Sequence, residues 1–334
     1  LQLIREVVGF AAALADGATT ALADSIAVAD EEGDSSISNS GVIGQTATST
    51  ATSVSVGVTV QGAAEGLVAG ATLVDGNTAA ASTAAGITTA AGVHSVGNSG
   101  AMTLTGSATA DSTKVDVTLA GVLTGVAAGA SLIDSQTVSS TLIQGILTNA
   151  GDDTVTNTAA ITGTATTVSD SLSVGIDIQG TLEGIGAGAV ISDGTTSGVA
   201  AAYGISTAAG ADTLDNNADL TITSTSTVDS TEVTVGIQGA VQGIGAGAAI
   251  MDSQTAAIAS TSLLDAGGDD DTITSAGILS GTATAGADSA SVGVTIQGTA
   301  EGIAAGAALT KAETTGVAET TGIAGGDAFG GALN

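Results

Sequence analysis

The chain has 334 residues, of which 33 are acidic and 3 are basic, so its formal net charge is −30. This charge repels a phosphate backbone or an anionic membrane surface, which excludes nucleic-acid binding. The chain has no cysteine, and its uncharged stretches are too diluted by Gly, Ser and Thr for a membrane-spanning helix, so we expect neither disulfides nor membrane insertion.

An internal repeat of 59 residues runs through the whole chain without an insertion. We therefore predict one continuous domain over residues 1–334 rather than several globular ones. Its copies lie at about 3–61, 62–120, 121–179, 180–238 and 239–297, with a partial copy at 298–334.

The first residues depart from the repeat with the apolar side chains of Leu3, Ile4, Val8 and Phe10. An open solenoid end exposes strand edges that must be capped or joined to another molecule. We expect these residues to form an assembly end. Because the chain begins without Met or a secretory signal, we also expect a processed form or a piece of a longer protein.

Residues 54–60 alternate apolar and small side chains, as a β-strand with two different faces does. The apolar positions Val56, Val58 and Val60 recur as aliphatic residues in each later repeat. Since residues two apart share one face of a strand, we predict that these columns point into an aliphatic core.

Two glycine columns follow this strand, one starting at Gly66 and the other at Gly70, and they predict tight corners or close backbone approaches. Apolar residues about twenty apart, such as Leu67 and Ile87, suggest three coils in each repeat. The fold class predicted is an all-β parallel β-solenoid (β-helix). With about three coils per repeat, it forms a rod roughly 80 Å long at ~4.8 Å per coil.

A helical fold is the competing interpretation, because residues 79–91 are rich in Ala. Thr, Ser, Val and Gly nevertheless dominate the chain, and helix caps are missing. These features favour the solenoid.

Acidic turns recur before a short predicted strand, as in Gly151-Asp152-Asp153-Thr154-Val155. They resemble part of the glycine- and aspartate-rich nonapeptide of calcium-binding RTX proteins, a resemblance that implies Ca²⁺ ligands. The tandem nine-residue spacing is missing, and a solvated turn is the alternative. The candidate ligands are Asp152, Asp153, Asp212, Asp269, Asp270 and Asp271. No cofactor is required otherwise.

A further acidic column comprises Asp16, Asp75, Asp134, Asp193 and Asp252 and ends at Lys311. If one repeat were a single coil, its carboxylates would lie ~4.8 Å apart and would need cations between them. With three coils per repeat the separation is ~14 Å and no metal is required. We expect solvated turn residues.

Thr-x-Thr tracts, notably residues 221–227 and 282–284, resemble the hydroxyl arrays of ice-binding solenoids. They do not visibly recur in every predicted coil, and Thr is also simply a good residue for an exposed strand. Catalysis is not expected, because the chain offers one His, one Arg and two Lys, and its paired acids do not converge in one cleft.

The last apolar side chains, Phe329 and Leu333, predict a second assembly end, so copies of the chain are the expected partner, stacked head to tail. In style, the repeat and its Gly-Asp turns resemble repeat regions of secreted haemagglutinin-type adhesins. This resemblance implies a non-catalytic structural rod outside the cell, at a microbial surface. The alternative is an adhesin or binding module for glycan, calcium or ice.

Overall fold

The computed structural model describes residues 7–325, in which every paired strand is parallel to its neighbours. Five strands of 46 residues alternate with strands of four or five residues, after a first strand of 23 residues. The bounds are β1 (Val7–Ala29), β2 (Ser35–Asn39), β3 (Ile43–Thr88), β4 (His94–Asn98), β5 (Met102–Leu147), β6 (Thr154–Asn157), β7 (Ile161–Ser206), β8 (Thr213–Asn216), β9 (Leu220–Asp265), β10 (Thr272–Ser275) and β11 (Leu279–Ala324).

The long strands form one sheet in the order β1-β3-β5-β7-β9-β11, and the short strands form a second in the order β10-β8-β6-β4-β2. Paired residues are 59 apart throughout, as Thr105 and Thr164 are. The prediction of an all-β parallel solenoid built on the 59-residue repeat is therefore confirmed.

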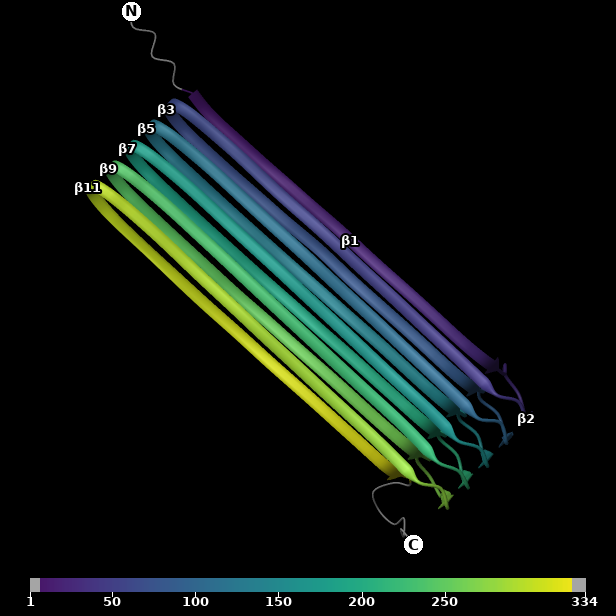
Figure 1. Ribbon diagram of the computed structural model, residues 1–334. Coiled ribbons are helices and arrows are strands. Elements are labelled where there is room, and N and C mark those ends of the chain that lie inside the picture. Colours follow the sequence, from purple (N-terminus) through teal and green to yellow (C-terminus); the bar gives the residue numbers. More distant parts are fainter. Residues whose placement is uncertain (1–6, 326–334) are drawn as a thin grey trace, which may run out of the picture.

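Each 46-residue strand doubles back near its middle, so that two straight limbs face one another (Figure 1). In β5 this turn lies at Leu123, which pairs with neither neighbouring strand, and at Gly125, which has a φ of 138°. Buried residues have even numbers before the turn and odd numbers after it. We call the first limb of a coil the outgoing limb (102–122 in β5) and the second the return limb (125–147). β1 is a return limb alone, since it pairs with residues 66–88.

One coil is thus one whole repeat, and the prediction of about three coils per repeat is wrong. The hydrogen-bonded neighbour of a residue lies 59 positions away, not twenty. Six return limbs at ~4.8 Å per layer give a height of only about 29 Å, while a limb of 23 residues is about 76 Å long. The solenoid is a flat slab whose long dimension lies across its axis.

The two glycine columns do what the sequence predicts. At the corner, a Cβ on Gly125 would lie 1.9 Å from the carbonyl oxygen of Gly66. Inside the return limb, a Cβ on Gly188 would lie 2.2 Å from Oδ2 of Asp177. The first column permits the turn, and the second leaves room for buried side chains of the opposite limb.

The principal apolar core lies where the short strands close the coil. Ile43, Met102, Ile161 and Leu220 from the outgoing limbs pack there with Val96, Val155 and Leu214 of the short strands. Beside it runs a ladder of amides, in which Asn39 donates to Asn98 (2.8 Å), Asn98 to Asn157 (2.7 Å) and Asn157 to Asn216 (2.7 Å). The ladder satisfies buried amides that would otherwise be costly.

The helical alternative is wrong for the part of the chain that the structure describes. The Ala-rich segment forms the end of the return limb of β3 rather than a helix. Among residues 7–325 there is no helix of the length and apolarity that a membrane crossing needs.

Candidate functional surfaces

The slab has two halves that differ in what they bury. In the second coil, the short-strand half comprises residues 102–110 and 139–157, and the turn half comprises residues 111–138. We use the same names for the equivalent positions of the other coils. The short-strand half buries Met102, Leu104 and Ile143, as an ordinary core does.

The interior of the turn half is mainly polar. Hydroxyls of facing limbs bond to one another, as Thr72 does with Thr59 and with Thr118 (both 2.8 Å). Further pairs join Ser53 with Thr78, Ser135 with Ser171, and Ser230 with Ser253. Each such bond contributes about 0.5–1.5 kcal/mol, so the limbs are held by many small contributions.

Four ionisable side chains are also buried in this interior. The Lys114 ammonium donates to the carbonyl oxygens of Gly76 and Asp134, and burial lowers its pKa to about 8. Burial also raises the pKa of Asp116 and of Asp177 to about 6.

Glu232 is the least satisfied of these groups. Burial, assisted by the charges of Asp193 and Asp252, raises its pKa to about 8. Among the residues that the structure describes, neither carboxyl oxygen has a partner in hydrogen-bonding geometry, and the nearby Ser192 hydroxyl only partly offsets the rise in pKa. A carboxyl group in such a site favours the protonated form, since desolvation penalises the charge.

The outer faces of the turn half are apolar, so the prediction that the valine columns point inward is wrong. Val58 is 54% exposed, and the columns beginning at Val56 and Val60 share its outward face. The inward positions between them are Gly57 and Thr59 and their equivalents. The alternation was read correctly as a strand, but with the wrong face buried.

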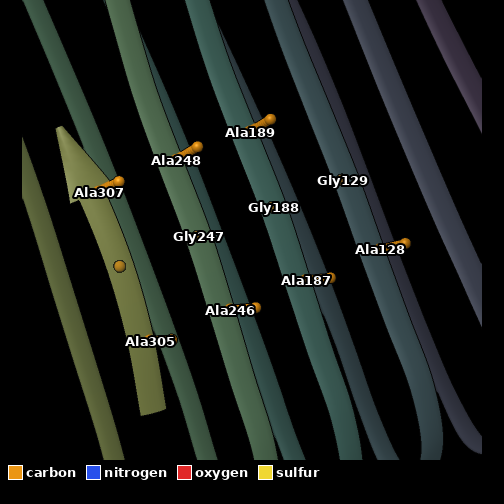
Figure 2. A pocket seen from close by; sticks show the side chains of 11 residues that line it. Ala128, Gly129, Ala187, Gly188, Ala189, Ala246, Gly247, Ala248, Ala305 and Ala307 are labelled. Atoms are coloured by element: carbon orange, nitrogen blue, oxygen red, sulfur yellow. The ribbon is translucent and has the colours of Figure 1, made fainter. Parts of the chain in front are cut away.

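On the return limbs, a shallow groove crosses several coils between two aliphatic columns. Alanine and glycine line it, and Figure 2 shows the alanine methyl groups projecting from neighbouring strands, for example Ala128, Ala189 and Ala248. The ridges beside it carry Ile185 and Ile191 and their equivalents. A groove of methyl groups offers no acid, base or nucleophile.

The acidic turns use their carboxylates to cap neighbouring coils. Oδ1 of Asp153 accepts from the amide of His94 (2.7 Å), Oδ1 of Asp212 from that of Asp153 (2.8 Å), and Oδ1 of Asp271 from that of Asp212 (3.0 Å). Asp153 and Asp212 are buried, and within residues 7–325 the Oδ2 atom of each has no partner in hydrogen-bonding geometry.

The other candidate calcium ligands are nearer the surface. Asp152 accepts from the amide of Ala211 (3.0 Å), and Asp269 has a φ of 88°, at the turn position where earlier coils have glycine. Asp270 follows it in the same exposed turn. Within residues 7–325, no group of three or more His, Asp or Glu side chains is arranged to hold a metal ion. The calcium site stays a prediction.

The aspartate column of the return limbs has a different geometry from the one expected. Asp16, Asp75, Asp134, Asp193 and Asp252 are partners in adjacent strands, so they follow one another at ~4.8 Å rather than ~14 Å. A second column on the outgoing limbs contains Asp111, Asp170, Asp229 and Asp288. Burial and the charges of Asp229 and Asp111 raise the pKa of Asp170.

The Thr-x-Thr tracts do recur in every coil, which the sequence interpretation missed. Thr46, Thr105, Thr164, Thr223 and Thr282 are successive ladder partners on the outer face of the outgoing limbs. Thr48, Ser107, Thr166, Thr225 and Thr284 form the next column, two residues along each strand. Aligning the sequence at the 59-residue period would have revealed both columns.

The predicted assembly ends are only partly within the described residues. Leu3, Ile4, Phe329 and Leu333 lie outside them; Val8 belongs to β1, but its side chain lies outside the description. Phe10 is 72% exposed on β1. Within residues 7–325, β1 and β11 are the outermost strands of the long sheet, each paired along one edge only.

Comparison with protein-family models, curated proteins and solved structures found no match to this chain. Its function is therefore inferred from its own residues.

Proposed function

We propose that the chain is a non-catalytic structural segment whose copies stack end to end into a filament outside the cell, at a microbial surface. The observation that carries this proposal is the complementarity of the two outermost return limbs, β1 and the second half of β11. The extracellular location rests on the adhesin-like style of the repeat.

Continuing the 59-residue register across a junction sets residue 7 of one copy beside residue 302 of the preceding copy. Inward-facing Thr19 then meets Thr314, which extends a column that is threonine in every coil. Outward-facing Leu14 meets Leu309, and both are largely exposed in the single chain. Such a junction supplies partners to main-chain groups that an open edge leaves unpaired.

Charge is complementary at one prominent position. Lys311 occupies the last place of the aspartate column, where its Nζ lies 3.3 Å from Oδ2 of Asp252. Stacking would place Asp16 of the next copy on the side of Lys311 that faces away from Asp252. Glu319 and Asp24 would meet as like charges eight residues further along the limb, and the contact between the lysine and the aspartate offsets this repulsion.

The outgoing limbs do not match as completely, because they form five layers where the return limbs form six. A stacked junction therefore joins the return limbs and leaves a place for one strand between the outgoing limbs. An added strand that fills this place would strengthen the junction.

The test is the length distribution of particles by negative-stain microscopy and sedimentation velocity, over a range of concentrations. We expect end-to-end stacks, several-fold weaker association for Lys311→Glu, and recovery when Lys311→Asp is combined with Asp16→Lys. Gln136→Glu adds a negative charge in the middle of the same sheet and serves as the control. Isolated slabs at every concentration would overturn the proposal.

A further inference from the structure

The outer face of the outgoing limbs carries a two-dimensional array of hydroxyl and methyl groups in the short-strand half. We call it the threonine face and define it by the columns that begin at Thr46 and Thr48. The first column is threonine in all five coils, and the second is threonine in every coil except at Ser107. Its side chains point to solvent, opposite the buried positions of the same strands.

The array has a definite period in both directions. Equivalent residues of adjacent coils lie ~4.8 Å apart, and residues two apart along a strand lie about 6.7 Å apart. In ice, tetrahedral water molecules joined by hydrogen bonds of about 2.75 Å place second neighbours about 4.5 Å apart and repeat along the hexagonal axis at about 7.3 Å. The two lattices agree to within about a tenth in each direction.

The support under the array is rigid and flat. The outgoing limbs run straight and side by side across all coils (Figure 1). Beneath the array, Leu104, Ile161 and Ile222 belong to the principal apolar core. Flat sheets are unusual and need side-chain ladders to stabilise them, and the amide ladder of the short strands lies at this end of the slab.

The hydroxyls of the threonine face are free for an external partner. In the described chain none of them bonds to another protein group, whereas inward-facing Thr141 and Thr261 donate to carbonyl oxygens of the opposite limb. The face carries no charged side chain before the aspartate column that begins at Asp111. A flat, uncharged, periodic surface does not suit a small ligand, which needs a concave site.

We propose that the threonine face binds the surface of ice. The methyl groups order adjacent water, the hydroxyls complete its hydrogen bonds, and many weak contacts act together because they share one period. This function is separate from end-to-end stacking, since the threonine face lies on the side of the slab and the junction lies at its edge.

The experiment observes single ice crystals in a solution of the full chain and measures thermal hysteresis and partitioning into slowly growing ice. We expect faceted crystals, measurable hysteresis and enrichment in the ice fraction. Thr164→Tyr combined with Thr166→Tyr places bulky side chains in the middle coil and should reduce hysteresis at least tenfold. Ser197→Tyr places the same side chain on the opposite outer face of that coil and should leave it unchanged.

Circular dichroism of each variant checks that the strands are retained. The Lys311→Glu variant, in which stacking is weakened, should still shape ice crystals. Round crystals and exclusion from ice with the folded wild-type chain would overturn the proposal. So would equal loss from the Ser197 variant, or retention on crystalline polysaccharide without any effect on ice.

Discussion

The short-strand half and the turn half consist of the same strands in the same register, yet they bury opposite kinds of side chain. In the short-strand half, Leu104 and Ile161 point inward and threonines point outward. In the turn half, Thr59 points inward and Val58 outward. Strand alternation therefore establishes that the two faces differ, but the space between the limbs decides which face is buried.

That space differs for a structural reason. In the short-strand half, a third strand closes the coil and contributes Val96 and Val155 to a core wide enough for large aliphatic residues. In the turn half the limbs face each other directly, and even a Cβ on Gly57 would lie 2.5 Å from Cγ2 of Thr72. Small and polar side chains therefore predominate there, and large aliphatic ones such as Ile133 are few.

The largest expected effect on stability comes from truncating an isoleucine in each half. Ile161 is 0% exposed in the apolar core, whereas Ile296 of the turn half is 53% exposed. We expect Ile161→Ala to lower the free energy of unfolding by about 2–5 kcal/mol and Ile296→Ala to lower it by less than about 1 kcal/mol. Urea denaturation measures both, and equal losses would break the comparison.

The largest pH-dependent effect is expected from the turn half. The folded-state pKa of Glu232 is about 8 and its ordinary value is 4.5, so the folded chain holds this proton more tightly than the unfolded chain does. The stability that this proton provides is present below about pH 4.5 and is lost as the pH rises to 8.

Glu232→Gln should therefore leave stability unchanged at pH 4 and raise it by a few kcal/mol at pH 8, because one pKa unit corresponds to about 1.4 kcal/mol. Thermal unfolding at several pH values measures the effect, and exposed Glu183→Gln is the control. Destabilisation by the Glu232 substitution at pH 8 would instead show that the ionised carboxylate is stabilised in the folded chain.

The two halves also differ in how their polar side chains are bonded. Asn157→Ala in the short-strand half leaves its ladder neighbours Asn98 and Asn216 short of a partner and should cost about 1–3 kcal/mol. Thr72→Val in the turn half removes hydroxyl bonds without changing shape and should cost about 1 kcal/mol. Chemical denaturation ranks them, and a reversed order would contradict this account.

The smallest effect concerns the aspartate columns, which border both halves. Adjacent carboxylates ~4.8 Å apart repel by about 0.9 kcal/mol in water, so added salt should raise the melting temperature. If the columns are only screened, Ca²⁺ and Mg²⁺ at millimolar concentration should act alike. A response specific to Ca²⁺ at micromolar concentration would instead support calcium binding by Asp152 and Asp153.

The sequence sufficed to predict the solenoid, the 59-residue period and both glycine columns, because each depends on local spacing. It did not suffice for the number of coils, since pairs such as Leu67 and Ile87 lie on one limb rather than in adjacent coils. Nor did it locate the threonine face, because coils of about twenty residues do not bring the tracts together, whereas coils of 59 residues do.

The direction of the valine columns could not have been predicted from alternation alone. Burying the face that carries Val58 stabilises the fold more than burying the face that carries Thr59 only where the limbs are far enough apart for valine side chains. That distance depends on long-range contacts with the return limb. The inward hydroxyl pairs, such as Thr59 with Thr72, become evident only once the turn at Gly66 is placed.

The most direct test of the single-coil solenoid is the distance from the start of an outgoing limb to the turn that follows it. Spin labels replace Thr103 and Leu123, which are both exposed, in a chain that has no cysteine of its own. A straight limb places the two backbone positions about 66 Å apart, and pulsed electron resonance should report a distance near that value. A separation of about 5 Å would mean that twenty residues complete a coil, and it would contradict the account.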